Sequence, residues 1–139
     1  MGGKIVFQKW ITRGFMRSLP EARFVFGDNT LRQGYGGQAA AMRDEPNAIG
    51  VATKWFPGGG NNQFFVDGDR AAIQIVDDDI DHVVAALLEG RDVYVPVDGL
   101  GTGLSELPNR APKLHQHIVD RFRALVADDA EFPWAINAS

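Results

Sequence analysis

An apolar segment that breaks into a glycine-rich loop and then into helix-forming residues places the strongest constraint on this fold. Residues 24–26 read Phe-Val-Phe and favour a β-strand, whereas residues 38–43 favour a helix. The loop between them holds Gly27, Gly34, Gly36, Gly37 and the polar pair Asp28-Asn29. Glycines let a backbone approach an anion closely, and the N–H groups of a first helical turn point at it. We therefore expect residues 23–43 to form a ligand-binding loop; a tight turn that needs positive φ is the simpler alternative.

The composition is that of a globular domain and excludes several kinds of site. The 139 residues are 45% hydrophobic and 23% charged, carry a net charge of −4 and contain no cysteine. Without cysteine there is no disulfide, thiolate nucleophile or cysteine-based zinc site. A negatively charged chain with no basic stripe is not expected to coat nucleic acid, and no run of about 18 apolar residues indicates a membrane span. We expect one cytoplasmic domain over residues 1–139, with residues 129–139 as a C-terminal tail.

Apolar runs alternate with segments of helical periodicity along the chain. Strands are expected at residues 4–7, 24–26, 49–53 and 92–97, and helices at 10–19, 38–43, 80–88 and 114–126. The short run Phe64-Phe65-Val66 is either a brief strand or a hydrophobic plug. Strands alternating with helices favour an α/β sheet sandwiched between helices.

Acidic residues precede the third of these helices. Asp77-Asp78-Asp79 lies just before its apolar stripe, and capping of a positive helix N-terminus explains the triplet more simply than a metal site does. Asp67-Gly68-Asp69 is expected to be only a turn, and Ser105 or Asn109 is expected to cap the last helix. The histidines, which we interpret as surface residues, are His82, His115 and His117. No metal and no cofactor is expected.

A second glycine-rich loop follows the strand at residues 92–97. It reads Asp98-Gly99-Leu100-Gly101-Thr102-Gly103-Leu104 and leads towards a helix. In open α/β sheets, ligands bind outside the carboxyl ends of the strands, where loops from different strands converge. We therefore expect the two glycine-rich loops to face one ligand.

Together the two loops resemble the signatures of macrodomains. Residues 95–104, Val-Pro-Val-Asp-Gly-Leu-Gly-Thr-Gly-Leu, are similar to the strand and diphosphate loop of that family. Asn29 followed by Gly36-Gly37-Gln38-Ala39 is similar to its other loop. The likeness spans residues 23–126. It implies a three-layer α/β/α sandwich with a mixed central sheet, and a site that binds ADP-ribose.

Within that family, the chain looks closest to the compact branch of terminal ADP-ribose protein glycohydrolases and of antitoxins that remove ADP-ribose from DNA. Thr53-Lys54 resembles a strand end of this branch, whose lysine acts on the anomeric carbon of the distal ribose. The branch has an aspartate after a Gly-Leu pair, whereas Ser105 follows Gly103-Leu104 in this chain.

The resemblance assigns roles to residues of both loops. The diphosphate would be held by backbone N–H groups of Gly99, Leu100, Gly101, Thr102, Gly103 and Leu104. Asn29 would hydrogen-bond the distal ribose, since an amide both donates and accepts. Gly36 and Gly37 would let the chain pass beside that sugar, and Gln38 belongs to the same ligand-binding loop.

Lys54 is the candidate nucleophile, provided that desolvation populates its free amine, and Asp98 or Asp28 would then move protons. The alternatives are a solvated surface lysine and an Asp28 that caps its own turn. Two functions stay open. One is an ADP-ribosyl hydrolase that removes ADP-ribose from a modified protein or nucleic acid. The other is a non-catalytic binding module for ADP-ribose or a related nucleotide, including a cyclic one. No membrane partner is expected, and the sequence leaves the oligomeric state open.

Overall fold

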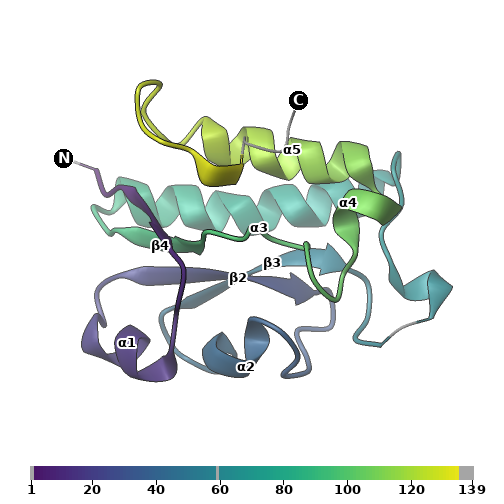
Figure 1. Cartoon of the computed structure of the whole chain (residues 1–139), viewed down its shortest axis with the longest axis horizontal. Coiled ribbons are helices and arrows are strands. Elements are labelled where there is room, and N and C mark those ends of the chain that lie inside the picture. Colours follow the sequence, from purple (N-terminus) through teal and green to yellow (C-terminus); the bar gives the residue numbers. More distant parts are fainter. Residues whose placement is uncertain (1, 59, 135–139) are drawn as a thin grey trace.

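A computed structural model describes residues 2–58 and 60–134, in which four β-strands and five α-helices form a mixed α/β fold (Figure 1). The strands are β1 (Ile5–Gln8), β2 (Arg23–Asn29), β3 (Ala48–Lys54) and β4 (Val93–Pro96). The helices are α1 (Arg13–Ser18), α2 (Ala39–Met42), α3 (Arg70–Leu88), α4 (Leu107–Arg110) and α5 (Pro112–Arg123), with a 3₁₀ turn at Asn61–Gln63. The predicted alternation of strands and helices is confirmed.

The strands form one sheet in the order β1-β4-β2-β3, and each of its three pairings is parallel. The expected mixed sheet is therefore wrong for the described strands; an antiparallel bridge between Lys54 and Phe64 lies outside them. Consecutive strands are joined through α1, α2 and α3. Each connection returns the chain to the edge of the sheet at which the preceding strand began. Parallel strands require such crossovers. As a result, the loops that follow β2 and β3 meet at one edge (Figure 1).

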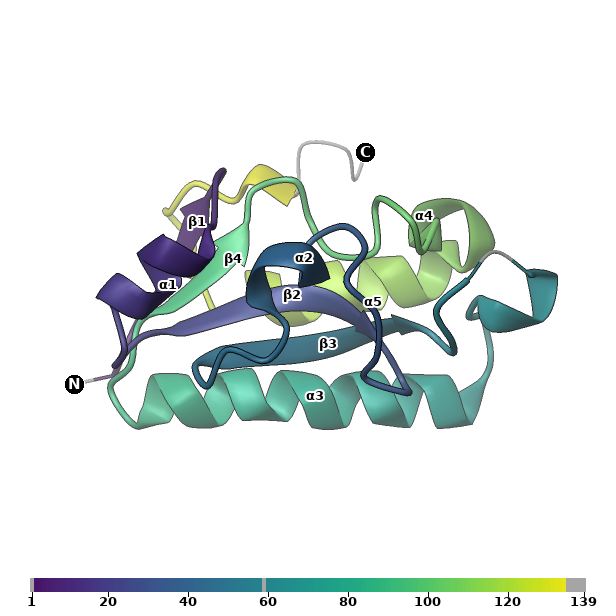
Figure 2. The same cartoon turned by 90° about the horizontal axis from the view of Figure 1, so that it is seen from below.

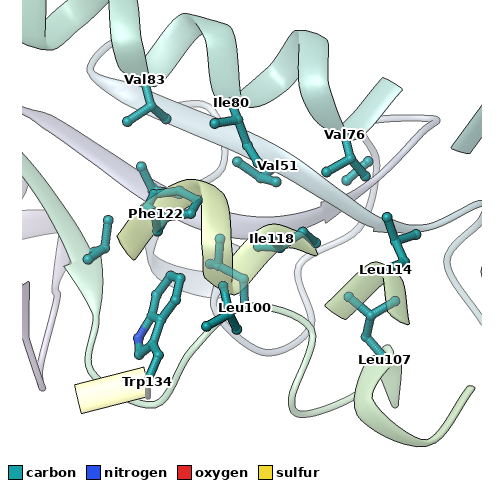
Figure 3. Packing of buried hydrophobic residues seen from close by; sticks show 14 of the residues in the cluster. Val51, Val76, Ile80, Val83, Leu100, Leu107, Leu114, Ile118, Phe122 and Trp134 are labelled. Carbon is teal, nitrogen blue, oxygen red and sulfur yellow. The ribbon is translucent and has the colours of Figure 1, made fainter. Parts of the chain in front are cut away.

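Helices lie on both sides of the sheet. Figures 1 and 2 show the long helices α3 and α5 on one side and the short helices α1 and α2 on the other. The larger core lies under α3 and α5 and contains Val51, Val76, Ile80, Leu114, Ile118 and Phe122, the last three being the stripe predicted for the final helix (Figure 3). A smaller core under α1 and α2 includes Met16, Phe24 and Met42.

The C-terminal segment is anchored to the larger core over the part that the structure describes. Phe132 and Trp134 are buried in the larger core, and the Trp134 indole N–H donates to the Pro96 carbonyl at 2.8 Å. Phe65 is fully buried, which confirms the plug interpretation of its segment. The remainder of the predicted tail, residues 135–139, lies outside the described residues.

Helix α3 begins at Arg70, well before the acidic triplet that was predicted to cap it. The Asp69 carboxylate accepts from the N–H groups of Ala71 and Ala72, so the expected turn supplies the cap. The reason is the alanine- and isoleucine-rich sequence after Asp69, which extends the buried stripe back to Ala72 and Val76. The prediction that Asp77-Asp78-Asp79 caps the helix is thus wrong. Within residues 2–58 and 60–134, no helix is long and apolar enough to cross a membrane.

The free N–H groups at the N-terminus of α5 donate hydrogen bonds to a residue from another part of the chain. The Asp67 carboxylate accepts from the N–H groups of Lys113 and Leu114 at 3.0 Å each. Neither of the residues predicted to cap this helix, Ser105 and Asn109, does so. Asp67 therefore ties the segment before α3 to the start of α5.

Candidate functional site

A cavity of about 380 Å³ opens at the carboxyl end of the sheet, between the two glycine-rich loops. The loop after β2 contributes Gly27, Asp28, Asn29, Gln33, Gly34, Gly36, Gly37, Gln38, Ala39 and Arg43 to its wall. The end of β3 and the residues that follow it contribute Thr53, Lys54, Pro57 and Gly58, and the second loop contributes Gly101, Thr102, Gly103, Leu104 and Ser105. The structure therefore brings both loops to one cavity. Of the candidate site residues, Asp98, Gly99 and Leu100 do not line it.

The second loop presents a row of backbone donors. Within the part of the chain that is described, none of the N–H groups from Leu100 to Ser105 donates a hydrogen bond to a protein acceptor. The loop is nevertheless held in place, because the Leu100 side chain is buried in the larger core and the Leu107 N–H donates to the Gly101 carbonyl at 2.8 Å. Successive free N–H groups in a fixed loop form a concave anion-binding site.

Gly99, with φ of +95°, and Gly101 both adopt backbone conformations that favour glycine, and Gly101 is also closely packed. The φ of Gly101 is +75°, and a Cβ there would lie 2.9 Å from Leu107 Cβ. Gly103 differs, since nothing lies within 4 Å of the position that its Cβ would take. The loop therefore depends on Gly101 for its shape, while Gly103 borders the open part of the cavity.

The first loop uses its side chains to hold itself together. Asn29 donates from Nδ2 to the Gln33 carbonyl at 2.7 Å, and its Oδ1 accepts from the Leu31 N–H at 3.1 Å. The side chain expected to bind a ribose thus closes a turn in the loop. This is the general tendency of asparagine to bond to its own backbone neighbourhood.

Gln38 links the two loops. Its Oε1 accepts from the Gly27 N–H at 2.7 Å, and its Nε2 donates to the Gly99 carbonyl at 3.0 Å. Both ends of the amide are therefore engaged with backbone. The position that we expected to contact ligand instead fixes the distance between the loops.

Gly36 makes room for a side chain of the second loop. A Cβ on Gly36 would lie 2.8 Å from Leu104 Cδ1, and one on Gly37 would lie 3.9 Å from the same atom. Leu104 is itself 66% exposed, so it reaches across the mouth of the cavity with little cover. In the structure it is therefore Leu104 that lies close to these glycines, and their predicted closeness to a sugar stays a prediction.

Lys54 lies at the end of β3 and is buried, with 8% of its surface exposed. Its Nζ donates to the Gly58 carbonyl at 2.9 Å and lies 5.4 Å from the centroid of the Phe64 ring. Among the ion pairs of residues 2–58 and 60–134, none joins Lys54 to a carboxylate. A buried ammonium with one carbonyl partner retains two N–H bonds for an anion.

The Asp28 carboxylate interacts with two arginine side chains. Its side chain is 3% exposed, forms an ion pair with Arg43 and lies 3.6 Å from Arg32. Its Oδ1 also accepts from the Asn29 N–H at 2.8 Å. Arg43 in turn donates to the carbonyls of Gln33 and Gly34. Asp28 is therefore the counter-ion of Arg43, and Arg43 stabilises the first loop through its hydrogen bonds to the loop carbonyls.

Asp98 lies outside the cavity. It is exposed, and its backbone carbonyl accepts from the Thr102 hydroxyl at 3.0 Å. The second loop turns after Asp98, so the residues that reach the cavity start at Gly101. Neither carboxylate named as a proton carrier is thus free beside Lys54.

An ion pair between Arg32 and Asp79, which the sequence did not indicate, extends this network to α3. Arg32 donates to both oxygens of Asp79, at 2.7 and 2.9 Å, and Asp79 Oδ2 accepts from the Ala52 N–H at 2.8 Å. Asp79 belongs to the acidic triplet, but its buried side chain faces the edge strand β3. The sequence did contain a signal that Asp79 is buried. Asp79 lies on the apolar stripe of the helix, three residues after Val76 and one before Ile80.

The fold and the cavity define a small parallel α/β protein with a cavity at its strand ends. A family model described as a family of unknown function, DUF7831, matches residues 6–121, and the chain belongs to that family. No curated protein and no solved structure matches the chain. Among the described residues, no group of three or more histidine or acidic side chains is arranged to hold a metal ion.

Proposed function

We propose that this protein binds ADP-ribose, or a closely related nucleotide, in the cavity between its two glycine-rich loops. The proposal includes a three-layer macrodomain-like arrangement, in which the helices on the two sides of the sheet form the outer layers. The observation that carries it is the row of N–H groups from Gly101 to Ser105, which have no protein acceptor among the described residues and belong to the same cavity wall as the buried Lys54. Such a row suits a diphosphate, which offers several acceptor oxygens in sequence.

The charges along the cavity support an anionic ligand even though the whole chain is negative. The carboxylate of Asp28 is balanced by Arg43 and Arg32, so it does not oppose the charge of Lys54. Lys54 then contributes one uncompensated positive charge in a site of low exposure, where electrostatic attraction is weakly screened. The ligand meets this charge and the backbone donors on the same wall.

Calorimetric titration with ADP-ribose tests the proposal. The wild-type protein is expected to bind it at micromolar concentration, and to bind ribose 5-phosphate and inorganic phosphate at least tenfold more weakly. Gly103→Glu adds a carboxylate to the cavity wall at a position where a Cβ meets no atom within 4 Å, and should lower the affinity at least tenfold. Leu88→Glu adds the same charge at an exposed site on α3 and serves as the control. No binding by the wild type, or equal binding by Gly103→Glu, would contradict the proposal.

Hydrolysis of ADP-ribosyl bonds is the second candidate function. It is favoured by one observation, the position of the buried Lys54 Nζ in the cavity wall without a carboxylate partner among the described residues. In this candidate the Lys54 amine loses a proton and attacks the anomeric carbon, and the bond from that carbon to the modified group breaks. Water then cleaves the bond between Lys54 and ADP-ribose, which releases ADP-ribose and restores the amine. The engaged state of Asp28 and the distant position of Asp98 leave the proton transfers to water or to the substrate.

Release of ADP-ribose from a modified protein and from modified single-stranded DNA separates the two candidates. Hydrolysis requires release by the wild type and loss of release in Lys54→Met, with Lys113→Met on the exposed start of α5 as the matched control. Binding without release by the wild type would leave the binding function and exclude the hydrolase.

A further inference from the structure

Three groups inside the cavity form a hydrogen-bonded chain. Thr53 Oγ1 lies 3.1 Å from the carbonyl oxygen of Asp28 and 2.6 Å from Ser105 Oγ. A carbonyl oxygen can only accept, so Thr53 gives its single hydroxyl proton to Asp28. Thr53 is then the acceptor in its contact with Ser105, and the Ser105 hydroxyl is the donor.

This direction determines what Ser105 offers to a ligand. Its proton is committed to Thr53, so only its lone pairs remain for another partner. Thr53 is fully buried, Ser105 is half-buried, and both line the cavity. Because the buried Thr53 fixes the rotation of the hydroxyl, Ser105 is a pre-oriented acceptor beside the backbone donors of its own loop.

Three other side-chain acceptors in the wall are engaged with protein donors, whereas the exposed Thr102, whose hydroxyl donates to the Asp98 carbonyl, and the exposed Gln33 keep acceptor capacity. The Asp28 carboxylate is paired with Arg43, and Asn29 Oδ1 accepts from a backbone N–H. Gln38 Oε1 accepts from the Gly27 N–H. A phosphate group brings acceptors alone and satisfies only the backbone row. A ligand that carries a hydroxyl donor next to its phosphates satisfies the row and Ser105 together.

We propose that Ser105 is a specificity-determining residue that accepts a hydrogen bond from a sugar hydroxyl of the bound nucleotide. Thr53 is the positioning residue that fixes the direction of the chain. This inference rests on the binding function proposed above and deepens it, because it states which chemical feature distinguishes the ligand from a simple diphosphate.

Titrations with ADP-ribose and with analogues in which single ribose hydroxyls are replaced by fluorine test this role. Fluorine keeps the size of the hydroxyl but cannot donate, so one analogue should bind the wild type about tenfold more weakly than ADP-ribose does. Ser105→Ala should bind ADP-ribose about fivefold to tenfold more weakly than the wild type does. This variant should bind that analogue and ADP-ribose with equal affinity. Thr53→Val should also lose the discrimination, whereas Thr53→Ser keeps the hydroxyl and should retain it.

The outcomes separate this inference from the binding function. If the wild type does not bind ADP-ribose, the proposed function fails and the role of Ser105 fails with it. If the wild type binds but Ser105→Ala binds with the same affinity and the same ratios among analogues, only the role of Ser105 is overturned. Ser105→Ala removes one oxygen at a half-buried site. A thermal unfolding curve of this variant is the control that its fold is retained. The test therefore stands even if Thr53→Val is unstable.

Discussion

The two glycine-rich loops at the carboxyl end of the sheet are alike in composition and opposite in how they use hydrogen bonds. The first loop is tied internally by Asn29 and Arg43, and Gln38 ties it to the second. The second loop is anchored at Leu100 and Leu107, and its N–H groups from Gly101 to Ser105 have no acceptor in the part of the protein that the structure describes. One loop supports the cavity, and the other presents donors to whatever occupies it.

Removing the cation that holds the first loop is expected to have the largest effect on stability. Arg43→Met leaves the buried Asp28 carboxylate with only the longer contact to Arg32, and should lower the free energy of unfolding by about 3 kcal/mol. Urea denaturation measures this loss. Adding Asp28→Asn to Arg43→Met removes the uncompensated charge and should restore part of the stability. A loss below about 1 kcal/mol in the single variant would show that the first loop does not depend on this pair.

Reshaping the second loop is expected to have the next largest effect. Gly101→Ala forces a side chain into a backbone with φ of +75° and against Leu107, and should destabilise the protein by about 2–3 kcal/mol. Gly103→Ala meets no neighbouring atom and should change stability by less than about 0.5 kcal/mol. Thermal unfolding of the pair compares them. Equal effects would mean that the shape of the loop is not set at Gly101.

Cutting the link between the loops should affect binding and stability to a similar degree. Gln38→Leu removes the bonds to Gly27 and Gly99, with an expected loss of about 1–2 kcal/mol in stability and about tenfold in affinity for ADP-ribose. Gln74→Leu alters an exposed glutamine on α3, outside the cavity wall, and should change neither. If Gln38→Leu bound as well as the wild type, the spacing of the loops would not matter for the ligand.

An ion pair remote from both loops provides the smallest expected effect. Burial alone would raise the pKa of Asp77, but hydrogen bonds from His117 and Arg121 outweigh it and lower that pKa below 3.8. Asp77→Asn should therefore cost about 0.5–1 kcal/mol near neutral pH. This difference from the wild type should shrink as the pH falls below about 3.8, where the native carboxylate becomes protonated. Ligand affinity should not change; a change would show that the α3–α5 contact influences the loops.

The sequence predicted the elements of the fold better than it predicted their partners. Local patterns located the four strands, the final helix and the Lys54 position at a strand end, because periodicity and turn residues are local signals. The ion pairs of Asp28 with Arg43 and of Arg32 with Asp79 join residues 15 and 47 positions apart, and no local pattern reports them. Asn29 and Gln38 were in the expected places, but their amides engage backbone that only the folded loops bring near. The direction of the strands depended in the same way on crossovers that periodicity does not describe.

The most direct test of the difference between the loops is an amide-resolved NMR titration with ADP-ribose. The account predicts that the N–H resonances of Gly101 to Ser105 move most and saturate with the ligand, because these groups acquire acceptors. The Gly27 N–H, which already donates to Gln38, should move little. Saturating shifts confined to the first loop, with the second loop unchanged, would contradict the assignment of the donor row as the ligand site.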